Sequence, residues 1–207
     1  MNTKGARTYS SPLRAEQAEQ TTARIVQAAV DLLSEGDSRD LSMTEVADRA
    51  GVSVRTVYRS FASKDELLDG VIGWVNAHIN QVTGANPKTR HDYETTTADV
   101  IEELFQIEPL LRALFATAAG RASHERTARG RGREESMRGA YAAELEGLDD
   151  GEARRLLAVL HLVASSNGAL FMKDYWDLPP EDIGRVMEWA IRVLADAAGD
   201  PAQREGL

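Results

Sequence analysis

Residues 41–72 read LSMTEVADRAGVSVRTVYRSFASKDELLDGVI, and this stretch decides the fold because three helix starts follow one another within it. Ser42 and Ser63 each precede a glutamate by three residues, which is the spacing of a helix capping box. Ser53 is a third N-cap residue, and Gly51 before it can adopt the positive φ of a sharp turn. The sequence therefore predicts two short helices on either side of Gly51 and a longer helix after Ser63.

The two short helices would form a helix-turn-helix motif, in which a turn of about three or four residues containing glycine joins two helices. Three valines would form their shared core: Val46, Val52 and Val57. The second helix, from Val54 to about Ser60, would expose a face made of four side chains: Val54, Arg55, Tyr58 and Arg59. Such a face can enter the major groove of DNA, which is about 12 Å wide.

Each side chain of this face has a role that its chemistry suggests. Arg55 lies in the first turn, the part of the helix that comes nearest to the base edges, and it would hydrogen-bond O6 and N7 of a guanine. Val54 would touch a thymine methyl group. Tyr58 and Arg59 lie one turn further along and suit phosphates or flanking bases. The alternative for all of them is a solvent-facing helix surface with no partner.

The ordered pattern Ala-Gly-Val-Ser, Thr-Val-Tyr-x-x-Phe and Ser-Lys-x-Glu-Leu resembles the N-terminal DNA-binding module of the tetracycline-repressor (TetR) family of bacterial transcription regulators. The resemblance runs from about Thr21 to Val75. It implies an all-α homodimer whose larger C-terminal domain binds a small molecule and pairs the subunits. It also implies phosphate contacts by three residues: Thr44, Tyr58 and Lys64. The complete expected DNA-binding set is Thr44, Ser53, Val54, Arg55, Thr56, Tyr58, Arg59 and Lys64.

One position departs from the family pattern. Many relatives carry a small residue, often glycine, where Arg55 stands. The arginine would therefore give this protein an additional base contact, or only an additional phosphate contact.

Composition indicates a soluble, globular, cytoplasmic protein. Of the 207 residues, 43% are hydrophobic and 28% charged, which suits a chain with a packed core. The absence of cysteine excludes a disulfide framework, a thiolate metal site and a cysteine nucleophile, and it agrees with a reducing compartment. No run approaches the roughly 18 apolar residues of a membrane span, and the first 20 residues lack the apolar core of a secretory signal. We expect no membrane contact.

The net charge of −9 is unevenly distributed. Residues 1–65 contain nine Lys and Arg and nine Asp and Glu, whereas the remaining residues contain 15 basic and 24 acidic groups. An acidic body beside a neutral N-terminal module permits that module to meet phosphates if its cations gather on one face.

No catalytic constellation is visible. The four histidines show no metal-ligand spacing, and neither a hydrolase nor a phosphate-loop motif occurs. We therefore expect no catalytic residue, no metal and no cofactor. Two other classes stay open: an enzyme with a helix-turn-helix appendage, and an adaptor whose module binds protein instead of DNA.

Helical periodicity dominates the chain and predicts an all-α fold with four parts: a disordered tail over 1–20, a helix-turn-helix domain over 21–66, a helical effector-binding and dimerisation domain over 67–198, and a tail over 199–207. The tail carries Lys4, Arg7 and Arg14, which would also suit a minor-groove arm. Helices are expected at Thr21–Ser34, Ser63–Val82, Tyr93–Ile107, Pro109–Ala118, Ala122–Glu146, Asp150–Lys173 and Pro180–Ala197.

The last two helices carry wide apolar stripes and are the expected dimer interface, as in the family. The stripe residues are Leu156, Leu160, Val163, Ala164, Met187, Ala190, Ile191 and Leu194. The alternative is that these stripes pack within one subunit.

Aromatic and polar residues of the central helices are candidates for an effector pocket, because ligand sites are mostly apolar with a few polar groups. They are Trp74, His78, Phe105, Phe115, Met137, Tyr141, Asn167, Phe171 and Trp176. Ordinary core is the alternative for each. Asn167 needs a partner if it is buried, and that partner would be a ligand, a water or the backbone.

Together these features predict a ligand-responsive repressor that binds a pseudo-palindromic operator in double-stranded DNA as a homodimer. A small, largely apolar effector would bind best to a conformation of the body in which the distance between the two recognition helices no longer matches the operator half-sites. Binding of the effector would therefore release the DNA. The sequence identifies neither the effector nor the operator, and repression and activation depend on where the operator lies.

Overall fold

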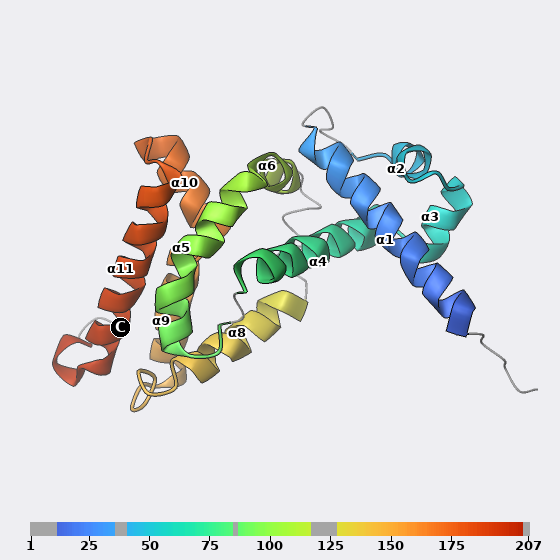
Figure 1. The fold of residues 1–207 in the computed structure, drawn as a ribbon. Helices are drawn as coiled ribbons and strands as arrows, with labels where there is room; N and C mark the ends of the chain where they lie inside the picture. Colours follow the sequence, from blue (N-terminus) through green and yellow to red (C-terminus); the bar gives the residue numbers. More distant parts are fainter. Residues whose placement is uncertain (1–11, 36–40, 85–86, 117–127, 205–207) are drawn as a thin grey trace, which may run out of the picture.

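The computed structural model describes residues 12–35, 41–84, 87–116 and 128–204. In these ranges the chain forms ten α-helices, one short 3-10 helix and no strand (Figure 1). The helices are α1 (Pro12–Ser34), α2 (Met43–Ala50), α3 (Val54–Ser60), α4 (Lys64–Thr83), α5 (Arg90–Gln106), α6 (Glu108–Ala116), α8 (Ala128–Ala140), α9 (Asp150–Val163), α10 (Ser166–Trp176) and α11 (Pro180–Gly199), followed by the 3-10 turn Pro201–Gln203. The predicted all-α fold is confirmed.

The N-terminal module begins and ends its helices where the sequence predicts. The Ser42 side chain accepts a hydrogen bond from the backbone N–H of Thr44 and caps α2. Gly51 ends α2 with φ 65°, a left-handed conformation that costs a glycine little. Ser53 and Ser63 cap α3 and α4 in the same way, through backbone N–H groups three residues later. Local capping chemistry therefore sets the short helices of this module.

One hydrophobic core joins the module to the rest of the molecule. It contains buried side chains from α1, α2 and α3, and it continues through α4 into α6. Helix α4 is 20 residues long, or about 30 Å, and Figure 1 shows it running from the module toward the body. Because α4 contributes to both parts, a displacement of the body can act on the module through it.

The body is built around the pair α5 and α11, which pack against each other more extensively than any other two helices among the described residues. Gly184 permits their close approach, since a Cβ at this position would lie 2.9 Å from the Cα of Ala98. Helices α9 and α10 complete the body, with cores around Tyr141 and around Met187.

Arg90 forms ion pairs that connect three segments of the body. Its guanidinium hydrogen-bonds Glu94 at 2.5 Å, Glu144 at 2.9 Å and also Asp196, so it links α5, the turn after α8, and α11. Partial burial opposes the charge of Arg90, but the three carboxylates outweigh it and raise the pKa of the guanidinium.

The structure corrects the sequence-based boundaries in three places. The helix expected to reach Glu146 ends at Ala140, and residues 141–147 form turns. Residues 12–20, predicted to be disordered, form the first turns of α1. The single helix expected over Asp150–Lys173 is two helices, because the chain turns at Ala164 and the Ser165 side chain caps α10. Most of tail 1–20 and the start of the expected helix Ala122–Glu146 lie outside the described residues.

Among the described residues, no single helix has both the length and the apolar character needed to cross a membrane. The pair α9 and α10 meets these conditions only when taken together, and it is bent by 55°.

Candidate nucleic-acid interface

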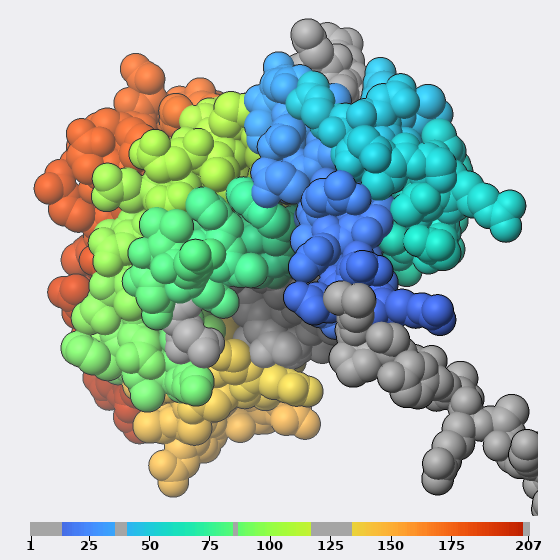
Figure 2. All heavy atoms as spheres, turned by 45° about the vertical axis from the view of Figure 1, so that its right-hand side comes forward, coloured from blue at the N-terminus to red at the C-terminus, as the bar shows by residue number. Residues whose placement is uncertain are grey.

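The inner side of helix α3 packs against the core, and its outer side faces solvent. Val57 is fully buried and Phe61, which follows the helix, is 7% exposed, so these two side chains anchor α3 in the core. Arg55 and Arg59 are exposed, and Tyr58 is 52% exposed. In Figure 2, the segment that contains α2 and α3 forms the right-hand end of the molecule and is not covered by the body. The structure thus groups Arg55, Tyr58 and Arg59 on a free face, as the sequence predicts.

Three other candidate residues, at the start of α3, also stabilise the helix itself. The Ser53 hydroxyl accepts a hydrogen bond from the backbone N–H of Thr56 at 3.1 Å, and the hydroxyls of Ser53 and Thr56 lie 2.8 Å apart. Val54 is half-buried against the core. These residues fix the start of the helix; Ser53 is exposed, whereas Val54 and Thr56 are half-buried.

Two further candidates lie at helix starts. Thr44 is exposed in the first turn of α2, and Lys64 is the first residue of α4 and is half-buried. Backbone N–H groups at a helix start attract phosphate oxygens, and a hydroxyl or an ammonium group beside them strengthens the attraction. Both positions are compatible with phosphate contacts.

The arginines of α3 have no counter-charge among the described residues. Within the described residues, neither Arg55 nor Arg59 forms an ion pair. Arg49 of α2, in contrast, binds Glu35 at 2.7 Å, and this bidentate contact holds the pKa of Glu35 below its ordinary value. The positive charge available to an external anion is therefore concentrated on α3 and not on α2.

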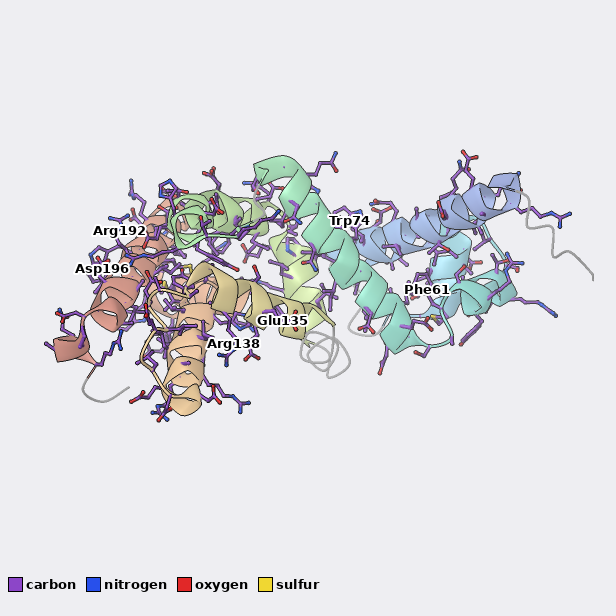
Figure 3. The ribbon with its side chains drawn as sticks, turned by 90° about the horizontal axis from the view of Figure 1, so that it is seen from below. Phe61, Trp74, Glu135, Arg138, Arg192 and Asp196 are labelled. Carbon is purple, nitrogen blue, oxygen red and sulfur yellow. The ribbon has the colours of Figure 1, made fainter. Side chains whose placement is uncertain are left out.

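The candidate pocket residues separate into groups. The Trp74 and His78 rings of α4 stack with centroids 4.9 Å apart, and His78 Nε2 lies 2.8 Å from Glu103 Oε1 of α5. Figure 3 shows Trp74 near the middle of α4, away from the end that Phe61 marks. Met137 and Tyr141 are buried in the core of the body, where burial raises the pKa of Tyr141.

The remaining pocket candidates do not share one interior. Phe105 is half-buried beneath the Lys173 ammonium group, 5.1 Å from its ring centroid, and Phe115 packs against the core of the N-terminal module. Three residues are on the surface of the chain instead of in its interior: Asn167, Phe171 and Trp176. The expectation that these three line an internal pocket is therefore revised, and Asn167 needs no buried partner because water reaches it.

Half of the expected dimer residues are buried in their own chain. Leu156, Leu160, Met187 and Ile191 are at most 3% exposed, so they have almost no surface left for a second subunit. The other four are half-buried: Val163, Ala164, Ala190 and Leu194. The apolar residues that do face solvent on α9 and α11 were missed, and they are Val159, Leu162, Val186, Trp189 and Val193.

The described residues contain no group of three or more His, Cys, Asp or Glu side chains that could hold a metal ion.

Known proteins share both the motif and the helical body. Residues 25–71 match the model of the bacterial regulatory proteins of the tetR family. The HTH-type transcriptional repressor KstR of Mycobacterium tuberculosis is 29% identical, over 52% of this chain and 62% of that protein. An HTH-type transcriptional regulator of Saccharopolyspora erythraea is 31% identical, over 47% of this chain and 41% of that protein. The chain thus spans less than two thirds of the length of these curated relatives.

Solved structures agree in fold. NalD of Pseudomonas aeruginosa, the secondary repressor of the MexAB-OprM multidrug efflux pump, has a TM-score of 0.58 at 18% identity, covering 86% of this chain and 96% of its own. A tetR-family transcriptional regulator of Streptomyces coelicolor has a TM-score of 0.57 at 16% identity, covering 88% and 86%. Fold and motif define a helix-turn-helix protein with a separate helical body. Residues 25–71 thus match the tetR family's regulatory-protein model, and the described chain shares the fold of solved TetR-family structures.

Proposed function

We propose that this chain is a homodimeric, DNA-binding transcriptional repressor, released from a pseudo-palindromic operator by a small, largely apolar effector. The observation that carries the proposal is the outer face of α3. It presents Arg55, Tyr58 and Arg59 to solvent, and no described acidic side chain pairs with the two arginines. A protein that needed only a soluble surface would gain little from leaving these cations unpaired beside an acidic body.

The proposed contacts differ in kind. Arg55, in the first turn of α3, would reach the base edges of the major groove. Tyr58 and Arg59, one turn further along, would bind phosphates or flanking bases, and the starts of α2 and α4 would hold phosphates through Thr44 and Lys64. Ser53, Val54 and Thr56 would then act mainly by fixing the pose of the helix.

The proposed dimer surface consists of the exposed apolar side chains of α9 and α11. Val186, Trp189 and Val193 recur on one side of α11, and Val159 and Leu162 do so on α9. Trp189 is 60% and Leu162 62% exposed in the single chain. Large exposed apolar patches on a soluble protein mark an interaction site, and a second copy would cover this one isologously.

The proposed effector site lies among the central helices, where Trp74 and His78 of α4 meet Glu103 of α5. A ligand here would act directly on the helix that links body and module. The regulatory class of the family, and the repressor names of KstR and NalD, support a regulator and not an enzyme. Its place of work would be the cytoplasm, where bacterial DNA is.

Selection of bound fragments from genomic DNA tests the proposal. We expect one recurring pseudo-palindromic site whose affinity falls steeply with salt, because phosphate contacts release counterions. Arg55→Ala should relax the sequence choice at one position of each half-site, whereas Lys64→Ala should weaken binding to all sequences alike. Failure to enrich any DNA would remove the proposal, and equal behaviour of the two variants would remove the assignment of roles.

A further inference from the structure

Helix α6 lies between the body and the N-terminal module, and its two sides have different partners. Leu110, Leu111 and Leu114 are buried in the core that α6 shares with α1 and α4. Glu108 and Arg112, one turn apart, lie largely on the other side, since about 160° separates each of them from Leu110 around the helix axis. One side of α6 is thus bound to the DNA-binding module and the other is available to the body.

That other side is fastened to α10 by a network of ion pairs. Arg112 donates two hydrogen bonds to the Asp174 carboxylate, at 2.8 and 2.5 Å, and a third to Glu108 at 2.7 Å. Lys173 binds Glu108 and also lies over the ring of Phe105 on α5. Hydrogen bonds from Lys173 and Arg112 lower the pKa values of Glu108 and Asp174 respectively, so both carboxylates stay charged at neutral pH. These four charged residues are called the α6–α10 clasp below.

Helix α10 carries, beside the clasp, an exposed set of aromatic rings. The Phe171 and Tyr175 rings stack with centroids 5.3 Å apart and planes 8° from parallel, and Trp176 meets Tyr175 edge to face at 5.2 Å. The three side chains are 58%, 70% and 64% exposed in the order Phe171, Tyr175, Trp176. Helix α10 itself packs against α9 and α11, and Figure 1 shows the orange α10 beside the red α11.

We propose that the α6–α10 clasp positions the DNA-binding modules of the dimer: it transmits how the partner subunit sits on the α9–α11 surface, through α10, which packs against both helices, and then through α6 to α1. This inference rests on the proposed function, because it presupposes a dimer that binds DNA. Arg112 and Asp174 are positioning residues in this account. They touch neither DNA nor the partner, and their loss leaves each module folded but free to rock on the body.

The test uses the full chain with the charge reversal Arg112→Glu, the reversal Asp174→Arg, and both together. Each reversal places like charges together, whereas the double variant restores the opposite-charge pair between positions 112 and 174 but leaves the glutamate introduced at position 112 one turn from Glu108. A matched control is Arg138→Glu on α8, because Arg138 and Glu134 form an ion pair of similar exposure (38% and 53%, against 42% and 50% for Arg112 and Asp174). Figure 3 places Arg138 on α8, within the body.

The distance between the two DNA-binding modules of the dimer is the quantity to measure. It should change if the clasp positions the modules, and it should not change if the clasp only stabilises the body. Since the chain has no cysteine, Asp48→Cys on the exposed side of α2 takes a single spin label. Pulsed electron resonance then measures the distance between the two labels of a dimer without any DNA. Unlabelled proteins are tested in parallel for affinity to a genomic fragment selected with the wild type, and for mass by sedimentation.

We expect each single reversal to broaden the label distance distribution and to weaken DNA binding about fivefold or more, while dimer mass and helix content stay unchanged. The double variant should regain most of the narrow distribution and of the affinity lost in the single variants, short of the wild type because of the new repulsion between the introduced glutamate and Glu108, and Arg138→Glu should change neither. Unchanged distances and affinity in the single variants would overturn the inference. Unfolding or monomer formation in the single variants would also overturn the inference, because the clasp would then stabilise the fold or the dimer instead of positioning the modules. The milder variant Asp174→Asn, which removes the charge without reversing it, tests whether that outcome is caused by the reversal itself. If the wild type itself forms no dimer or selects no DNA, the proposed function fails instead.

Discussion

The close crossing of α5 and α11 predicts opposite effects for two glycine-to-alanine changes. An alanine Cβ at position 184 would lie 2.9 Å from the Cα and 3.1 Å from the Cβ of Ala98. Neither of these atoms can rotate away, so the two helices must separate. At Gly73, on the exposed side of α4, a Cβ would meet nothing within 4 Å.

The magnitudes follow from two opposing terms. Overpacking a core contact costs about 1–3 kcal/mol, whereas alanine in place of glycine inside a helix gains about 1 kcal/mol. Gly184→Ala should therefore lower the free energy of unfolding by up to about 2 kcal/mol after this gain is counted. Gly73→Ala should raise it by about 0.5–1 kcal/mol, because only the gain applies.

Urea unfolding followed by circular dichroism measures the difference. Protein concentration is held constant for all variants, since unfolding of a dimer depends on it. The reasoning is refuted if Gly184→Ala proves as stable as Gly73→Ala, because α5 and α11 would then not be in close contact at Ala98. The contact matters for function, since it fixes which side of α11 faces outward.

Two other changes test separate parts of the molecule. Trp189→Asp should convert the dimer to a folded monomer in sedimentation, whereas the core substitution Met187→Leu should leave a dimer; a dimeric Trp189→Asp protein would show that α11 is not in the interface. Asp92 accepts hydrogen bonds from the backbone N–H groups of Lys88 and Thr89, which lower the pKa of its carboxyl. The stabilisation is therefore present at neutral pH and lost as pH falls below the ordinary value of 3.8, so Asp92→Asn should flatten the acid side of a stability–pH profile. A profile as steep as that of the wild type would contradict this role.

The helices of the N-terminal module could be predicted because local chemistry determines them. Ser53 and Ser63 cap the helices that follow them, and Gly51 ends α2 at the residue where a positive φ is required. The exposure of Arg55 and Arg59 followed from the spacing of Val57 and its neighbours. These features depend on residues less than about one turn apart, so one sequence suffices to find them.

The start of α1 was missed because it has no apolar side to reveal it. Residues 14–20 are all exposed, and their helix rests on good helix formers such as alanine, glutamate and glutamine after a proline at the first position. The break between α9 and α10 also left a signal, the Ser-Ser-Asn-Gly sequence at 165–168, which is typical of a helix cap and not of a helix interior.

The proposed dimer surface could not be selected by periodicity alone. Both α9 and α11 carry buried as well as exposed apolar side chains, and the more regular stripe, with Leu160 and Ile191, is buried in the core of the single chain. Contacts such as that between Arg112 and Asp174 join residues 62 positions apart, and nothing in the sequence near either residue indicates the other.

The central claim is that two copies of α3 lie in the major groove of one duplex. Dimethyl sulfate attacks guanine N7, an atom that is open only in the major groove, so protection from this reagent on the selected DNA site reports the claim directly. We predict two protected blocks about one helical turn apart, both weakened by Arg55→Ala together with Arg59→Ala. A bound complex without N7 protection, or with one block only, would contradict it.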